Sequence, residues 1–287
     1  MKKLLVLSGK GGTGKTTTSA AFIKFSGAKA IADCDVDAPN LHIVAGLKEE
    51  PETSDFMGSD KAYIDPEKCI GCGACMERCR FDSIRMVDGK CQILEYACEG
   101  CGVCEAVCPA EAIHLETDRA GHLYLYRGDR TLSTAKLKMG RGNSGKLVSD
   151  VKLALIHAAG DEELAIIDGS PGIGCPVISS VSGVDMVLIV AEPSMSGVSD
   201  LERILKTASI LQTKVAVCVN KFDTNREKTE AIVNLCHEKD IPFVGKIPYD
   251  KKASEAINAG LSLADFDCPA RDALYETYQN TMDILNK

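Results

Sequence analysis

The stretch Gly9-Lys10-Gly11-Gly12-Thr13-Gly14-Lys15-Thr16-Thr17 decides the fold of this 287-residue chain. It satisfies G-x-x-x-x-G-K-[ST], with a strand-like apolar run (3–7) before it and a helical pattern (16–25) after it. Glycines let backbone N–H groups close around phosphate oxygens, and the helix start adds the positive end of its dipole. We expect all nine residues to line a nucleotide, with Lys15 reaching its β- and γ-phosphates and the Thr16 hydroxyl ligating Mg²⁺. The flanking strand and helix disfavour the alternative of a chance glycine-rich turn.

The rest of the chain alternates between strand-like and helical patterns. Strand-like apolar runs span 3–7, 29–32, 164–167, 186–191, 215–219 and 243–247. Helical patterns span 16–25, 147–158, 199–211, 226–239, 251–259 and 273–285. This alternation predicts an α/β fold with a mostly parallel sheet covered by helices on both faces. We also expect a hairpin from 122–127 and 131–138, followed by a glycine-rich loop at 140–145.

Composition narrows the class of protein. The formal net charge is −8, so the basic surface of a DNA-binding protein is not expected. No apolar run approaches the ~18 residues of a membrane span, and the apolar run at residues 4–7 is too short for a secretory signal. We therefore expect a cytoplasmic protein that binds neither nucleic acid nor membrane. Its 14 cysteines, in a compartment that keeps thiols reduced, favour metal binding over disulfides.

Eight of the cysteines form two runs with the same spacing, C-x₂-C-x₂-C-x₃-C. This is the spacing of bacterial two-cluster ferredoxins, in which the fourth cysteine of each run ligates the other cluster. The predicted ligand sets of two [4Fe-4S] clusters are Cys69, Cys72, Cys75 and Cys108 for one, and Cys98, Cys101, Cys104 and Cys79 for the other. Arg80 stands where the pattern prefers proline, which changes the charge near one cluster without removing a ligand. Paired C-x₂-C motifs also form Cys₄ zinc sites, which is the alternative.

The cysteine runs interrupt the strand–helix alternation after its second strand. We therefore predict two domains. Residues 1–57 and 119–287 form the nucleotide-binding domain, and residues 58–118 form an inserted, bacterial-ferredoxin-like α+β domain. The insert is acidic and poor in long apolar runs, so its core is expected to be something other than hydrophobic side chains.

Lys10 directly follows the first glycine, and KGGTGKTT resembles the deviant Walker A motif of the MinD/ParA/Mrp ATPases and of the nitrogenase iron protein. The resemblance covers about 1–48 and 145–260. It implies a P-loop ATPase that binds ATP or ADP in a homodimer, or in a heterodimer with a paralogous ATPase. It also implies that Lys10 reaches the partner's phosphates and stabilises their charge in trans, much as an arginine finger does. A solvated lysine near the phosphates is the alternative.

Two acidic segments match the resemblance. Residues 33–41, DCDVDAPNL, are similar to the switch I aspartate box. This implies that Asp35 positions the attacking water and that Asp33 and Asp37 help to hold the waters of the metal. Residues 164–172, LAIIDGSPG, resemble a Walker B strand that runs into switch II, with Asp168 as an outer holder of Mg²⁺. Ser170 departs from the proline that is common at its position, and the alternative for the first segment is a loop with a helix cap.

Two later segments resemble the elements that surround the base. Asn220, in VNKFD, is the implied contact to adenine. Pro248 and Asp250, in IPYD, belong to a segment similar to one that packs near the base. These two resemblances are less specific than the phosphate-binding loop.

Cys175 lies seven residues after Asp168. In the nitrogenase iron protein a switch II cysteine at this offset ligates a cluster shared across the dimer. The resemblance implies that Cys175 lies at a dimer face and holds a third, bridging cluster. A cysteine at the start of a helix is the alternative.

These features lead to three hypotheses. The first is an ATPase that couples its nucleotide state to electron transfer through two [4Fe-4S] clusters, with an unidentified redox partner. The second is an Mrp-like scaffold or carrier that delivers clusters to apoproteins under the control of ATP. The third is a positioning ATPase of the MinD or ParA type, which the lack of a basic terminal helix disfavours.

Overall fold

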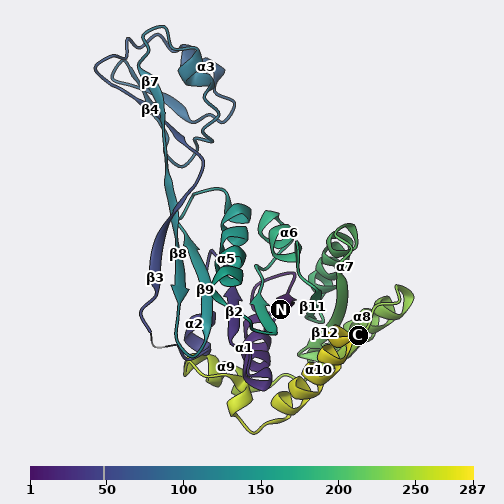
Figure 1. Ribbon diagram of the computed structural model, residues 1–287. Helices are drawn as coiled ribbons and strands as arrows, with labels where there is room; N and C mark the ends of the chain where they lie inside the picture. The colour runs from purple at the N-terminus through teal and green to yellow at the C-terminus, as the bar shows by residue number, and fades with distance from the viewer. Residues whose placement is uncertain (48) are drawn as a thin grey trace. The chain divides into compact units, whose positions relative to one another are not determined.

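The computed structural model describes residues 1–47 and 49–287, which divide into two compact units (Figure 1). Unit 1 comprises Met1–Thr53, Leu123–Lys136 and Gly145–Lys287. Unit 2 comprises Ser54–His122 and Leu137–Ser144. Each unit has a hydrophobic core of its own. The core of unit 2 combines cysteines with alanines and isoleucines, so the expectation that its core would lack hydrophobic side chains is wrong. The predicted insertion thus falls in unit 2, together with short flanking stretches and a separate loop.

A nine-stranded sheet is formed by the described residues, in the order β13-β12-β11-β1-β10-β2-β9-β8-β3. Its strands are β1 (Lys2–Leu7), β2 (Ala30–Asp33), β3 (Glu52–Met57), β8 (Arg119–Tyr126), β9 (Thr131–Leu137), β10 (Leu164–Asp168), β11 (Met186–Ala191), β12 (Lys214–Asn220) and β13 (Phe243–Ile247). Neighbours from β13 to β9 pair in parallel, so the carboxyl ends of these strands meet along one edge. The connection between β8 and β9 is too short for a parallel crossover, so these strands form a hairpin.

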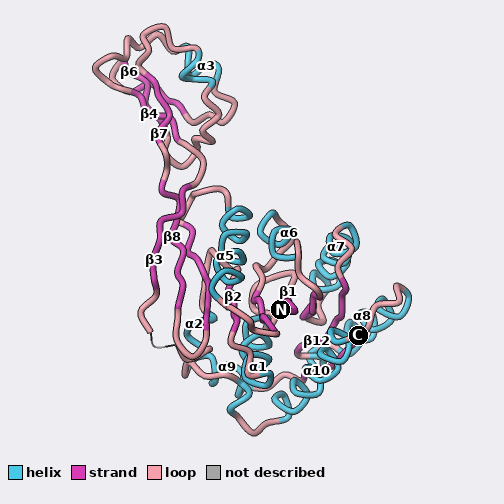
Figure 2. Tube along the Cα trace, viewed as in Figure 1, coloured by secondary structure: helices cyan, strands magenta, loops and turns pink. Residues whose placement is uncertain are grey.

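Helices cover both faces of this sheet (Figures 1 and 2). One side carries α1 (Lys15–Ser26), α9 (Lys251–Asn258) and α10 (Pro269–Asn286). The other carries α5 (Ser144–Ala158), α6 (Cys175–Val181) and α7 (Met195–Ile210), and α7 contacts α8 (Arg226–Glu238). Phe22 of α1 is fully buried, and its ring meets that of Tyr278 of α10 edge to face at 5.2 Å. Burial of such a ring contributes about 1.5–3 kcal/mol, which fixes α1 and therefore the loop before it.

The predicted alternation of strands and helices is confirmed. Each of the six strand-like runs overlaps an observed parallel strand, and each of the six helical patterns overlaps an observed helix. The hairpin predicted between residues 122 and 138 is also present, as β8 and β9. The structure adds elements that the sequence analysis did not assign, among them β3, α6 and the short helix α2 (Leu41–Val44).

Unit 2 is a structural repeat in which equivalent residues lie 29 positions apart. In the first half, β4 (Lys61–Ile64), α3 (Ala74–Arg78) and β5 (Ile84–Val87) correspond to β6 (Lys90–Ile93), α4 (Val103–Ala106) and β7 (Ile113–Glu116) of the second. The halves exchange strands, because β4 pairs with β7 and β5 pairs with β6, both antiparallel. The repeat seen in the cysteine spacing is therefore also a repeat of the backbone.

Glycine is required where each cysteine loop of unit 2 approaches the backbone. Gly71 and Gly100 are equivalent and have positive φ angles of 70° and 67°. A Cβ on Gly71 would lie 2.1 Å from the carbonyl oxygen of Gly89, and a Cβ on Gly100 would lie 1.9 Å from that of Asp60. No side chain fits at either position, so both loops keep the same tight shape.

The loop 137–144 packs within unit 2 through Arg141. Its guanidinium forms ion pairs with Asp118, at 2.9 Å, and with Glu95. It also lies 5.6 Å from the centre of the Tyr96 ring. The sequence analysis assigned this loop to the nucleotide-binding domain, because contacts between residues so far apart in the chain leave no local pattern.

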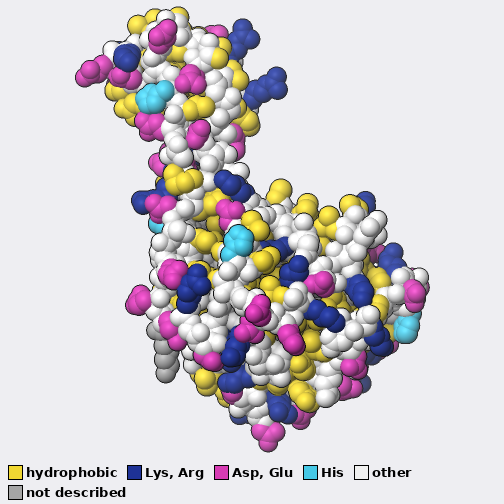
Figure 3. All heavy atoms as spheres, in the orientation of Figure 1, with side chains coloured by type: hydrophobic (Ala, Val, Ile, Leu, Met, Phe, Trp, Pro, Cys, Tyr) yellow, Lys and Arg dark blue, Asp and Glu magenta, His cyan; other side chains and the backbone are white. Residues whose placement is uncertain are grey.

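Charged side chains are distributed over the surface without a visible pattern on the face that is drawn. On the face drawn in Figure 3, acidic and basic side chains are intermixed rather than gathered in a stripe of one sign. Within the described ranges, no helix is long and apolar enough to cross a bilayer.

Candidate nucleotide-binding site

The glycine-rich stretch forms a loop between the end of β1 and the start of α1. Gly12 and Gly14 have φ angles of 78° and 97°, which favour glycine. A Cβ on Gly14 would lie 2.2 Å from Nδ2 of Asn220, and one on Gly9 would lie 2.1 Å from Cβ of Asp200. The loop therefore combines a backbone that only glycine adopts easily with neighbours that leave no room for a side chain.

Lys15, the first residue of α1, is buried beside three carboxylates. Its Nζ lies 2.9 Å from Oδ2 of Asp168 and 4.0 Å from Oδ2 of Asp35. Burial lowers the pKa of Lys15, but Asp168, Asp33 and Asp35 outweigh it and raise the pKa above its ordinary value. Despite these ion pairs, Nζ has no well-aligned hydrogen-bond acceptor among the described residues. A buried ammonium with unused donors fits a phosphate group.

Asp168, the last residue of β10, is fully buried and held by two hydroxyls of α1. Thr16 Oγ1 donates to Oδ2 at 2.7 Å, and Ser19 Oγ donates to Oδ1 at 2.7 Å. Both oxygens therefore point toward the start of α1. A hydroxyl and a carboxylate in direct contact are the pair that holds Mg²⁺ in phosphate-binding loops, one as ligand and the other in the outer shell.

Asp33 organises the loop after β2. Its Oδ1 accepts from the Asp35 amide at 3.0 Å, and its Oδ2 accepts from the amides of Asn40 and Leu41 at 2.9 and 3.0 Å. Burial, followed by the charge of Asp168, raises the pKa of Asp33 to about 7. Since both oxygens are occupied by backbone donors, the structure shows Asp33 shaping the loop, and its role toward the metal stays a prediction.

Asp35 lies closer to solvent and lines the cavity described below. Burial raises the pKa of its carboxyl, and Lys15 opposes this. Ser170 connects the two acidic segments by donating a hydrogen bond to the carbonyl of Cys34, the residue before Asp35. The predicted water-positioning carboxylate therefore lies beside Lys15 on a loop that is fixed at both ends.

Lys10 is directed toward the start of α7. Its Nζ lies 3.1 Å from Oε2 of Glu192 and 3.3 Å from the hydroxyls of Ser194 and Ser196. These groups belong to the same chain, so the structure shows a position in cis. The predicted contact with a partner's phosphates stays a prediction.

Asn220, at the end of β12, supports the phosphate-binding loop. Its Nδ2 donates to the Thr13 carbonyl at 2.7 Å, and its Oδ1 accepts from the Lys221 amide at 2.9 Å. Lys221 Nζ donates to the Gly12 carbonyl at 2.9 Å. The side chain predicted to read the base thus holds the loop, and its contact with a base stays a prediction.

The cavity beside these residues has a volume of about 360 Å³. It is lined by seven of the nine residues of the phosphate-binding loop, all except Gly9 and Thr13, by Asp35 and Asn40, and by the β12 and β13 ends with Asn220, Pro248 and Asp250. The structure therefore brings the phosphate, water-positioning and base segments to one cavity. Asp250 caps α9 by accepting from the Lys252 amide at 2.9 Å, so its side chain faces its own helix.

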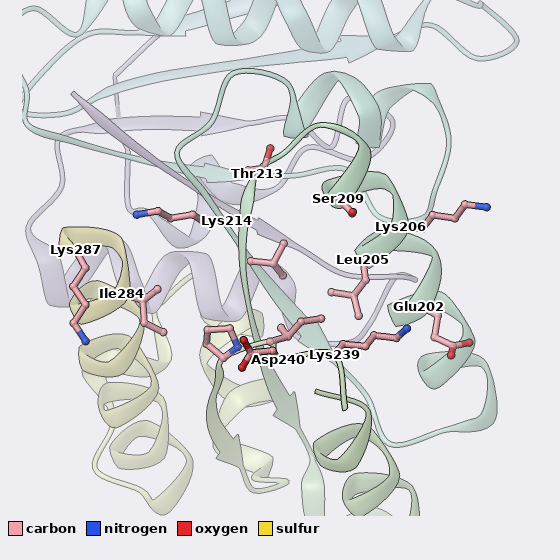
Figure 4. A pocket seen from close by; sticks show the side chains of 13 residues that line it. Glu202, Leu205, Lys206, Ser209, Thr213, Lys214, Lys239, Asp240, Ile284 and Lys287 are labelled. Carbon is pink, nitrogen blue, oxygen red and sulfur yellow. The ribbon is translucent and has the colours of Figure 1, made fainter. Parts of the chain in front are cut away.

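A larger hollow of about 840 Å³ lies at the amino ends of β12 and β13 (Figure 4). Its lining combines aliphatic side chains, such as Leu205 and Ile284, with exposed lysines, such as Lys206 and Lys239. Among the described residues that line it, no buried titratable side chain is present. We therefore place the chemistry at the smaller cavity.

Three functional residues were missed by the sequence analysis. Ser19 lies one turn after Lys15 on the same helix face, so helical spacing could have indicated it. Asn40 and Lys221 contact the site through the fold of their loops, and no local pattern distinguishes them.

The cysteines of unit 2 gather in its core. Cys69, Cys75, Cys98 and Cys104 are buried, and Cys79 and Cys108 pack against them. A small cavity is lined by Cys69, Cys72, Cys75 and Cys108, together with Cys91. Within residues 1–47 and 49–287, no group of three or more His, Cys, Asp or Glu side chains is arranged to hold a metal ion. Cys175 is exposed at the start of α6.

The comparisons with known proteins agree with this site. A model of the CobQ/CobB/MinD/ParA nucleotide binding domain matches residues 4–263. The uncharacterized protein MJ0578 of Methanocaldococcus jannaschii is 33% identical over 292 residues, which cover 99% of this chain and 97% of its own. An iron-sulfur cluster carrier protein of Pyrococcus horikoshii is 26% identical, over 99% of this chain and 87% of its own.

Solved structures match the fold at low identity. The septum site-determining protein MinD of Pyrococcus horikoshii, complexed with Mg-ADP, has a TM-score of 0.57 and 17% identity, and the match covers 99% of this chain and 96% of that one. The fold and the site define an ATP-binding P-loop protein. The chain belongs to the CobQ/CobB/MinD/ParA family of nucleotide-binding proteins.

Proposed function

We propose that this P-loop ATPase holds two [4Fe-4S] clusters in unit 2 and couples its nucleotide state to one-electron transfer through them. When bound, such clusters supply sites that accept and release single electrons. The observation that carries the proposal is that Cys69, Cys72, Cys75 and Cys108 line one cavity. This is the ligand set that the ferredoxin spacing assigns to one cluster, and it includes the predicted cysteine from the other run.

Hydrogen bonds to sulfur support the same proposal. The amide of Cys91 donates to Cys69 Sγ at 3.5 Å, and the amide of Ala112 donates to Cys108 Sγ at 3.3 Å. Backbone donors of this kind stabilise thiolates and help to set the potential of a bound cluster. No ion-sized group of ligands is present in the described residues. Since a four-iron cluster is bulkier than an ion, its ligands stand farther apart at its corners.

Hydrogen bonds to sulfur also occur in the second set. The amide of Ala62 donates to Cys98 Sγ at 3.4 Å, and Cys79 Sγ lies 3.0 Å from the Ser83 hydroxyl. Burial raises the pKa of Cys104, and the charges of Cys98 and Cys101 add to this rise. Cys79 joins the same hydrophobic core.

The chain itself supplies a route for coupling. The loop that Asp33 shapes leads through α2 into β3, the strand by which the chain enters unit 2. Contacts to the γ-phosphate order switch loops, and hydrolysis releases them. We propose that ATP acts on residues 33–41 and thereby changes the reduction potential of the clusters.

Iron-sulfur carriage is a second candidate function. It is favoured by the relative from Pyrococcus horikoshii, whose printed name is iron-sulfur cluster carrier protein. In that case ATP would control release of a cluster to an apoprotein. The burial of four of the eight predicted ligands favours retained clusters, and therefore electron transfer.

Anaerobic purification tests the proposal. We expect brown protein with about eight irons per chain, and midpoint potentials that shift when Mg²⁺ with ATP or ADP is added. Colourless protein without iron would refute the proposal. Midpoint potentials that stay the same when nucleotide is added would also refute it. Nucleotide-accelerated transfer of iron to an apo-ferredoxin, with no shift in potential, would instead identify a carrier.

Cys175 allows a separate test of the bridging cluster. If this exposed residue binds a third cluster between two chains, Cys175→Ala will lower the iron content of each dimer by about four. Equal iron in the two proteins would assign Cys175 to the start of α6 alone.

A further inference from the structure

We propose that the Cys91 thiol donates a hydrogen bond to a sulfur ligand of one cluster site, and that it raises the reduction potential of this site alone. The inference rests on the proposed function, because it concerns the cluster held by Cys69, Cys72, Cys75 and Cys108. We name this set site A, and the set of Cys98, Cys101, Cys104 and Cys79 site B.

Cys91 lies inside site A without belonging to the ferredoxin spacing. Its side chain is 4% exposed and lines the same cavity as the four predicted ligands of this site. Its amide donates to Cys69 Sγ at 3.5 Å. Its thiol acts on the pKa of both neighbouring ligands, lowering that of Cys69 and raising that of Cys75. A fifth sulfur therefore contacts two ligands of this site.

The repeat in unit 2 shows which residue stands in the matching place of site B. Lys61 and Lys90 are equivalent, and they donate to the carbonyl groups of Cys98 and Cys69. The next residue in each half, Ala62 or Cys91, donates its amide to the sulfur of that same cysteine. The two sites thus share their lysine and amide donors. They differ in one side chain, which is the thiol of Cys91 at site A and the methyl group of Ala62 at site B.

The direction of the thiol's effect follows from which sulfur carries a proton. Cys69 and Cys75 would bind iron as thiolates, which have no proton to donate. The Cys91 thiol would then carry the one proton among these three sulfurs, and it can donate that proton to one ligand sulfur at a time. Reduction adds one electron to the site and breaks no bond, and a donor to a ligand sulfur stabilises the added negative charge. The thiol therefore makes site A easier to reduce.

Other charges near the two sites are similar or exposed. Lys61 and Lys90 match each other across the repeat. Arg80 follows Cys79 of site B, and its exposed guanidinium is screened by water. Comparing each site with its own variant removes these contributions.

The test is a redox titration of the full-length anaerobic protein, with dithionite as reductant and the clusters followed by electron paramagnetic resonance. We expect Cys91→Ala to lower one midpoint potential and to leave the other unchanged. A sulfhydryl hydrogen bond worth a two- to tenfold change in the equilibrium predicts a shift of up to about 59 mV for a one-electron couple. Cys91→Ser keeps a donor and should restore the potential.

Ala62→Cys is the matched variant, because it places the thiol in site B. It should raise the other midpoint potential and leave that of site A unchanged. If the wild-type protein binds two clusters and both variants have its midpoint potentials, the inference is overturned and the proposed function still stands. Loss of four irons from Cys91→Ala would also overturn it, since Cys91 would then be a ligand. Wild-type protein without iron would refute the proposed function itself.

Discussion

Thr16 Oγ1 and Asp168 Oδ2 lie 2.7 Å apart, which joins the phosphate-binding loop to the end of β10. Ser19 reaches the other oxygen of the same carboxylate from the next turn of α1. Thr16 lines the nucleotide cavity, whereas Ser19 is fully buried behind it. The two hydroxyls share an acceptor and differ in their access to a bound metal.

This difference predicts separate effects of two substitutions. Thr16→Ala should remove the dependence of ATP affinity on Mg²⁺, because the hydroxyl ligand is lost. Ser19→Ala should keep that dependence and lower the free energy of unfolding by about 1–3 kcal/mol, since a buried carboxylate oxygen loses its donor. Calorimetric titration of ATP with and without Mg²⁺, with urea unfolding, measures both. An unchanged Mg²⁺ dependence in Thr16→Ala would contradict the assignment.

Asp35 is expected to act in hydrolysis rather than in binding. Asp35→Asn keeps the shape of the side chain and removes its charge, so ATP hydrolysis should fall by about 10²-fold or more while ATP still binds. Asp37→Asn is the control, because Asp37 lies two residues later, is exposed and, unlike Asp35, does not line the cavity. Phosphate release and nucleotide affinity are measured for both variants. A similar loss of hydrolysis in both would assign the effect to the loop.

Asn220 offers a test of whether its main role is structural. Its amide nitrogen is already bonded to the Thr13 carbonyl, so Asn220→Ala should loosen the phosphate-binding loop. We expect the affinities for ATP and GTP to fall together, by about tenfold, because a partly buried hydrogen bond that orders the loop is lost. Competition binding with both nucleotides measures the ratio. A loss confined to ATP would show that Asn220 reads the base.

Buried thiols predict how stability depends on alkaline pH. Burial raises the pKa of Cys218, in the core of unit 1, to about 12 from an ordinary value of 9.0. Between these values the unfolded chain loses this proton and the folded chain keeps it, so unfolding is favoured as pH rises. Each pH unit costs up to about 1.4 kcal/mol for this group, and below pH 9 the cost disappears.

Cys218→Ala tests this dependence. The variant is less stable at neutral pH because it leaves a small cavity, but its free energy of unfolding should fall less steeply between pH 9 and 10.5. Urea unfolding under reducing, anaerobic conditions at several pH values measures the two slopes. Parallel slopes would show that Cys218 ionises equally in both states.

The parallel sheet could be predicted because its central strands are continuous apolar runs. Met186–Ala191, for example, is buried along its whole length. β3 could not, since ETSDFM has only one buried residue and lacks any apolar run. α6 was missed because it spans seven residues after a glycine-rich turn. Strands of this kind depend on pairing with distant segments rather than on local composition.

The candidate site shows the same division. The residues of the phosphate-binding loop and Asp168 follow directly from a local motif and a strand end. The role of Asp33 in shaping its loop depends on amides seven and eight residues away, and Lys221 acts on a loop more than 200 residues earlier. Such contacts form only when the fold brings the strand ends together, so local sequence patterns do not predict them.

The ion pairs of Arg141 with Asp118 and Glu95 have a consequence for anyone who wishes to cut the cysteine-rich unit out of this protein. A fragment of residues 58–118 would lack the loop 137–144. Asp118, Glu95 and Tyr96 would then lose their contacts with Arg141. An isolated unit 2 must therefore join two chain segments, so that it also contains the loop 137–144.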